Sequence, residues 1–145
     1  MEAIQNGSLG KVFTVYLERG ELLLESLLAA LERFGVKNAV LLGAIGSLQK
    51  VELHRVTSLS EKPEDEYITI DKPVEISSMQ GLVLDGKAHM HMVVSSVEEA
   101  YTGHLENGTQ VLYLVEMTIA ELTDCQAVRI DKNGISALQK KISAK

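Results

Sequence analysis

The sequence has a single cysteine, no tryptophan and no long apolar run. Cys125 has no second cysteine with which to form an intrachain disulfide, so the chain carries no sign of an oxidising compartment. No stretch approaches the roughly 20 apolar residues of a membrane span. Residues 1–7 lack the basic and apolar regions of a signal peptide. These absences predict a cytoplasmic protein without a membrane segment.

Positive charge is also scarce. The chain has 14 Lys and Arg residues against 20 Asp and Glu residues, a net charge of −6. A phosphate backbone repels an acidic protein whose cations are scattered, so the composition argues against direct DNA binding. Several lysines gather after residue 131, where they are more typical of a solvated tail than of a DNA-binding arm.

Aromatic residues are few, so the core must be built from Leu, Val, Ile and Met. A chain of 145 residues is typical of one domain. We divide the sequence into an N-terminal lead (residues 1–10), one domain (11–131) and a basic C-terminal tail (132–145).

One helix is predicted. A strand pattern over residues 11–18 precedes residues 21–34, where leucines recur at spacings of three and four and form one apolar stripe. Gly35 is placed as the left-handed residue that ends this helix.

The remainder is predicted to be β-structure. Asp85-Gly86 between apolar runs is a strong hairpin signal, and residues 43–47 are small enough for a turn. Short turns join antiparallel strands, so the predicted class is α+β, an antiparallel sheet with one main helix packed on it. The predicted strands are residues 38–42, 48–56, 67–70, 74–79, 82–84, 89–95, 101–105, 111–119 and 125–130.

Three predicted strands are apolar on both faces: residues 40–42, 90–94 and 111–115. Such strands must be covered on both sides, and one helix cannot cover a whole face of a sheet of this size. Either the sheet folds over on itself or a second subunit covers it, and we expect both. We predict an oligomer rather than a monomer.

The chemistry of the sequence is concentrated in three histidines. His89 and His91 are two positions apart on a predicted strand, so both side chains point to the same face. His104 follows Gly103 after a connector long enough for the chain to return beside that strand. Three imidazoles around one ion leave a fourth position open, as in catalytic zinc sites. The alternative is that His89 and His91 bind no metal and are ordinary solvent-facing histidines on a strand.

Three further residues bear on this chemistry. Glu116 lies within the apolar strand 111–119 and is the candidate general base for a metal-bound water, unless it is simply exposed. His54, between Leu53 and Arg55, is interpreted as a surface histidine, and Cys125 as a small buried hydrophobic residue.

Taken together in order, several glycine and histidine motifs resemble the PPC domain (plants and prokaryotes conserved), over about residues 12–130. The residues that carry this resemblance are Gly20-Glu21, Gly43-x-x-Gly46-Ser47-Leu48, Gly81-x-x-x-Asp85-Gly86-x-x-His89-x-His91, Gly103-His104-Leu105 and Gly108.

The resemblance implies an α+β domain that assembles as a homotrimer. It implies a zinc site, known in prokaryotic members, whose ligands match His89, His91 and His104. Plant members carry AT-hook segments for DNA, whereas this chain has no Arg-Gly-Arg-Pro hook. Prokaryotic members are often labelled as candidate DNA-binding proteins by analogy.

Three functions follow as hypotheses. The first is a trimeric zinc-binding domain of regulatory or scaffold type, whose protein or small-molecule partner is unknown. The second is a metal-dependent enzyme acting on a small molecule. The third is a DNA-binding regulator, which the family analogy favours and the charge does not. Imidazole also suits other divalent transition metals.

Overall fold

The computed structural model describes residues 1 and 3–142 and consists of one helix and nine strands. The helix and strands are β1 (Leu9–Glu18), α1 (Leu23–Arg33), β2 (Ala39–Val56), β3 (Asp65–Ile70), β4 (Val74–Leu84), β5 (Lys87–Ser95), β6 (Ala100–Leu105), β7 (Gln110–Leu122), β8 (Ala127–Lys132) and β9 (Ile135–Lys140). All strand pairs are antiparallel, which confirms the predicted α+β class. Among these residues, no helix is long and apolar enough to cross a membrane.

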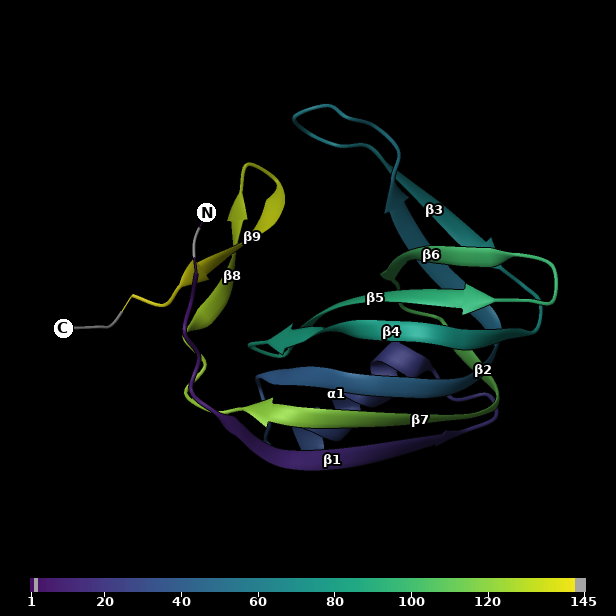
Figure 1. Ribbon diagram of the computed structural model, residues 1–145, viewed down its shortest axis with the longest axis horizontal. Helices are drawn as coiled ribbons and strands as arrows, with labels where there is room; N and C mark the ends of the chain where they lie inside the picture. Colours follow the sequence, from purple (N-terminus) through teal and green to yellow (C-terminus); the bar gives the residue numbers. More distant parts are fainter. Residues whose placement is uncertain (2, 143–145) are drawn as a thin grey trace.

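The main sheet has the strand order β1-β7-β2-β4-β5-β6, with β3 added at β2 (Figure 1). The long strand β2 pairs with β7 and β4 in its first half and with β3 and β6 in its second half. Because β6 pairs with both β5 and β2, the sheet curls back on itself. The prediction that the sheet folds over is thus confirmed, and this closure positions the histidines.

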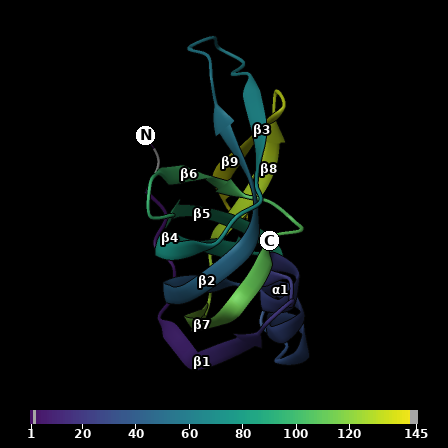
Figure 2. The same ribbon diagram turned by 90° about the vertical axis from the view of Figure 1, so that its right-hand side faces the viewer.

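The helix covers one side of the sheet at β1, β7 and β2 (Figures 1 and 2). Its apolar stripe buries Leu23, Leu24, Leu27 and Leu31 within the main core. Met90 and Met92 of β5 are also buried in that core, so the opposite face of β5 carries its histidines outward. Gly35 has a φ of 69°, which confirms the predicted left-handed helix end.

Two predicted interruptions are wrong. Residues 43–47 are not a turn, because β2 runs unbroken through them with bulges that absorb the extra residues. The predicted strands 74–79 and 82–84 likewise form the single strand β4, with a bulge between Ile76 and Ser78. Small residues here serve close strand packing: a Cβ on Gly46 would lie 2.2 Å from the Leu114 carbonyl oxygen.

The C-terminal region is more ordered than a tail. Residues 127–140 form the β8–β9 hairpin around Asn133-Gly134, both with positive φ, so the boundary predicted at residue 132 falls inside a folded hairpin. Residues 143–145 of the predicted tail lie outside the described residues. Cys125 is buried beside Leu84 and Ala127, as predicted for a small hydrophobic residue.

Candidate metal centre

The three predicted histidines meet on one face of the curled sheet. His89 and His91 stand on β5 after the Asp85-Gly86 turn, whose residues have φ values of 49° and 75°. His104 of β6 is the direct strand partner of His91. One nitrogen from each of the three rings lies within 4.8 Å of the other two. The structure therefore brings together the complete predicted ligand set.

The geometry suits a small tetrahedral ion. The Nε2 atoms of His89 and His91 are 3.1 Å apart. Two nitrogens bound to one zinc ion at about 2.0–2.1 Å in tetrahedral geometry would be separated by roughly 3.3 Å. The His104 ring meets both other rings edge-on, at centroid distances of 4.9 and 5.3 Å. Three nitrogen donors can thus converge on one point without rearranging the strands.

Partial burial favours the neutral form of these imidazoles. Desolvation is the main cause that lowers the pKa of His89 and of His91 and lowers the pKa of His104 to about 4. The neighbouring His54 lowers the pKa of His104 further. A neutral imidazole is the form that binds metals, so the ligands are ready to bind at neutral pH.

These shifts predict acid sensitivity of the metal-free protein. The unfolded chain takes up a proton at His104 near pH 6.5, whereas the folded chain does so only near pH 4. The free energy of unfolding is therefore expected to decrease as the pH falls from about 6.5 towards 4. Urea unfolding at pH 7.0 and 5.5 measures this decrease, and H104Q should reduce it. An unchanged pH dependence in H104Q would contradict the assignment.

A fourth histidine, which the sequence analysis interpreted as a surface residue, belongs to the cluster. His54 of β2 is the strand partner of His104, and the two rings stack at a centroid distance of 4.5 Å. Its side chain is 23% exposed and its Nδ1 lies 2.5 Å from Glu106 Oε1. His54, His104 and Glu106 form a second group whose ligand atoms lie within 4.8 Å of one another. The interpretation of His54 as a surface residue is corrected accordingly.

Nδ1 of His54 and Oε1 of Glu106 are within hydrogen-bonding distance of each other. A carboxylate partner of this kind favours the charged imidazolium and holds the ring in place. Glu106 thus holds the His54 ring, and that ring supports one face of His104.

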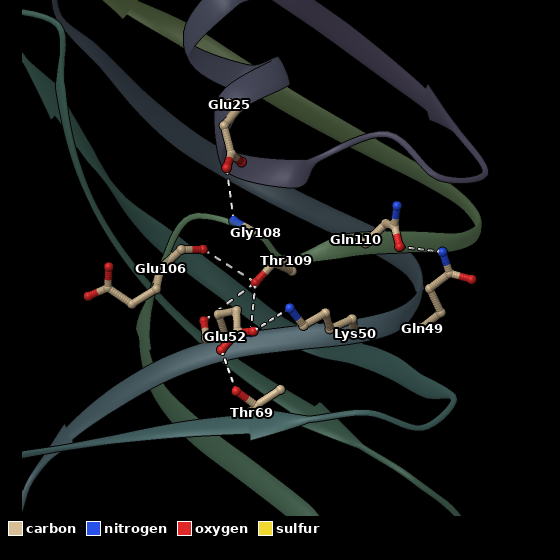
Figure 3. Close-up of polar contacts among 9 residues, drawn as sticks. All are labelled: Glu25, Gln49, Lys50, Glu52, Thr69, Glu106, Gly108, Thr109 and Gln110. Atoms are coloured by element: carbon tan, nitrogen blue, oxygen red, sulfur yellow. Dashed lines mark hydrogen bonds and ion pairs between the residues drawn. The ribbon is translucent and has the colours of Figure 1, made fainter.

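The turn that carries Glu106 is itself fixed by polar contacts (Figure 3). The Glu106 amide donates to the Glu52 carbonyl at 3.0 Å, and the fully buried Thr109 hydroxyl accepts from the Glu52 amide at 3.0 Å. The Gly108 amide donates to Glu25 Oε1 of α1 at 2.8 Å. These bonds tie the turn after β6 to β2 and to the helix, and so set the position of Glu106.

Gly103 explains how β6 reaches β2. A Cβ at this position would lie 2.6 Å from the His54 carbonyl oxygen, so only glycine permits this approach of the two strands. The Gly103-His104 pair therefore places a candidate metal ligand directly after the glycine that permits the close approach of the strands. No local pattern in the sequence reveals that His54 lies opposite, because the β2–β6 pairing joins residues 50 positions apart.

Glu116 lies elsewhere. Its exposed side chain is on β7, paired with Tyr16 and Ile45, and the strands β2 and β4 lie between β7 and β5. It belongs to neither of the two potential ligand groups among the described residues. The carboxylate beside the histidines is Glu106.

The sequence matches the family model of the Plants and Prokaryotes Conserved (PCC) domain over residues 4–123. A comparison with curated proteins finds no significant match.

Several solved structures share the fold. The metal-containing protein from Archaeoglobus fulgidus is 20% identical, with a TM-score of 0.79 over 98% of this chain and 100% of that chain. A plant- and prokaryote-conserved (PPC) protein from Pyrococcus horikoshii is 24% identical, with a TM-score of 0.76 over 99% and 100% of the two chains. A candidate DNA-binding protein from Bacteroides thetaiotaomicron is 16% identical, with a TM-score of 0.71 over 94% and 96%.

Proposed function

Since the chain belongs to the Plants and Prokaryotes Conserved domain family, we propose that it is a trimeric metal-binding domain of regulatory or scaffold type. His89, His91 and His104 hold one divalent ion, and zinc is the proposed metal. The observation that carries this proposal is the convergence of three imidazole nitrogens within 4.8 Å of one another. The metal-containing protein from Archaeoglobus fulgidus, which shares the fold, supports it.

The donor set favours zinc over harder cations. Imidazole nitrogen suits zinc and neighbouring transition metals, whereas magnesium and calcium prefer oxygen ligands. Three protein ligands leave one coordination position for water or a small ligand. A zinc ion held in this way lowers the pKa of bound water and polarises oxygen groups.

The trimer is proposed from apolar side chains that share the histidine face. Strand pairing places Tyr16 of β1 and Ile45 of β2 on either side of Glu116 of β7. A line of successive cross-strand partners also connects Val12 of β1 to His89 of β5. The partners between them are Ala120, Val40 and Leu82. Cross-strand partners point to the same face of a sheet. Val12, Tyr16 and Ile45 are 60%, 54% and 62% exposed in the single chain. Contact between copies of the chain would bury this surface.

A metal-dependent enzyme acting on a small molecule is the second candidate. The observation that favours it is the Glu106–His54 pair beside the histidine cluster, since a carboxylate-bound imidazole near an open metal position resembles an acid–base arrangement. Glu116, separated from β5 by two strands, is not the base in this version of the hypothesis.

The proposal also covers DNA binding, cellular location and the binding partner. Two solved structures of the same fold are named as candidate DNA-binding proteins, but the net charge of −6 leads us not to propose DNA binding here. We propose a cytoplasmic location, because the single cysteine offers no intrachain disulfide. The partner of such a regulatory domain is a protein or a small molecule.

The proposal is tested on the purified protein by elemental analysis and light scattering. We expect about one zinc ion per chain and a mass about three times that of the 15.9 kDa chain. A protein that contains no transition metal, and binds none when zinc is supplied, would overturn the metal assignment. A monomeric mass would overturn the trimer.

Glu106 offers a separate test of the surrounding contacts. E106Q removes the charged acceptor that holds His54 against His104. We expect zinc affinity to decrease by less than the roughly tenfold or greater loss that follows when a hydrogen bond to a ligand itself is removed, because His54 only stacks on the ligand His104. Competition with a zinc-binding dye measures the affinity. E98Q, in an exposed loop, is the matched control. Equal affinities of E106Q and the wild type would show that the pair does not support the site.

A further inference from the structure

The C-terminal hairpin folds onto the histidine face of the sheet. Ala127, at the start of β8, is buried in a small cluster with Leu84 and Cys125, against which Leu82 also packs. Leu82 is the strand partner of His89, so these two side chains point to the same face. The hairpin therefore begins beside the position of His89.

One side chain of this hairpin carries an uncompensated charge. Arg129 lies two residues after Ala127, so both side chains are on the same face of β8, the one that packs against the sheet. Its Nη1 donates to the Ser136 carbonyl at 3.3 Å. Its Nε is buried and has no hydrogen-bond partner among the described residues, and no ion pair found among them includes Arg129.

Such a group has a physical cost. A buried donor without an acceptor, on a charged group without a counter-ion, is unfavourable and typically indicates a missing partner. Burial lowers the pKa of Arg129, in line with this desolvation. The Arg129 charge lowers the pKa of His89, after burial itself, which agrees with the placement of this side chain on the face of β8 that packs against the sheet.

The charges around the cluster do not balance. Three neutral imidazoles add no negative charge to a divalent ion, and Arg129 adds a further positive charge. The carboxylate beside the cluster, Glu106, is already hydrogen-bonded to His54. A centre with this excess of positive charge attracts an anion to its open position.

We propose that the open position of this centre takes a small oxyanion, a carboxylate or a phosphate, whose charge is held by the guanidinium of Arg129. This inference rests on the proposed metal-binding function. Arginine suits the task because its planar fork binds carboxylate and phosphate oxygens through paired hydrogen bonds. Arg129 lies on β8, outside the family-matched residues 4–123.

The test uses the full chain loaded with cobalt(II), whose visible absorption changes when a ligand enters its coordination sphere. Acetate and inorganic phosphate are titrated separately at constant ionic strength, because salt screens exposed charges. The two titrations distinguish a carboxylate from a phosphate ligand. R129Q is compared with R129K, and R33Q on α1 removes an equal charge away from the site. Circular dichroism and cobalt content show that each variant is folded.

We expect R129Q to bind cobalt normally and to weaken anion binding by about tenfold or more, with a smaller loss in R129K and none in R33Q. Anion affinity in R129Q within about twofold of the wild type would overturn the inference while the metal assignment stands. The same holds if neither anion changes the wild-type spectrum. A wild-type chain that takes up no cobalt would overturn the metal proposal and this inference with it.

Discussion

H91A is expected to lower the zinc content of the purified protein from about one ion per chain to nearly none. His91 contributes the Nε2 atom that lies 3.1 Å from Nε2 of His89, so its loss leaves two of the three nitrogen ligands. Loss of a supporting hydrogen bond already costs about 10- to 100-fold in metal affinity, and loss of a direct ligand should cost more. Elemental analysis and a competition titration measure the effect.

The control for this variant is chosen from the neighbouring strand. Gln80 is the exposed cross-strand partner of His91, and Q80A should keep its zinc. Because the His91 side chain is itself exposed, H91A should leave the free energy of unfolding of the metal-free protein nearly unchanged. Full zinc content in H91A would exclude His91 as a ligand.

G81A is expected to destabilise the protein by about 3 kcal/mol or more, at or above the upper end of the usual range for a single substitution. Gly81 of β4 has a φ of 155°, where side chains are strained, and it pairs with Met90, between the two histidines of β5. A Cβ there would lie 2.1 Å from the His89 carbonyl oxygen and 2.8 Å from the Met90 Cα. The strands would have to separate at the proposed metal site, so zinc affinity should also decrease.

The same substitution at Gly43 provides a matched control. A Cβ on Gly43 would meet nothing within 4 Å, and its φ is not in the left-handed region, although it also lies within a strand of the same sheet. G43A should change the free energy of unfolding by less than about 1 kcal/mol. Urea unfolding and zinc titration of both variants measure the difference. Equal stabilities of G81A and G43A would contradict the role assigned to Gly81.

Much of the site was predictable from local pattern. Side-chain alternation along a strand determines that His89 and His91 share a face, and the Asp85-Gly86 turn determines where that strand begins. The leucine spacing of the helix and the glycine that ends it also depend only on neighbours in sequence. The small residues of β2 misled the prediction, because glycine serves close strand packing as readily as it serves a turn.

Groups brought together over long sequence distances were not predictable in this way. His54 joined the cluster only because β2 is long enough to pair with β6 in its second half. Glu116 was the candidate base because it lies in an apolar strand, yet the strand order separates it from β5. The sequence analysis did not identify Glu106, which lies beside the histidines. The C-terminal residues looked like a tail because nothing local indicates that β8 covers Leu82 and Leu84.

The sequence by itself determined the class of fold, the helix, the hairpin before β5 and the shared face of two histidines, because each depends on contacts between residues close along the chain. The tertiary structure decided which further groups surround the predicted histidines: His54 through closure of the sheet, Glu106 through the turn after β6, and Arg129 through the C-terminal hairpin. These contacts depend on the order of the strands and on closure of the sheet, and neither can be predicted from periodicity in the sequence.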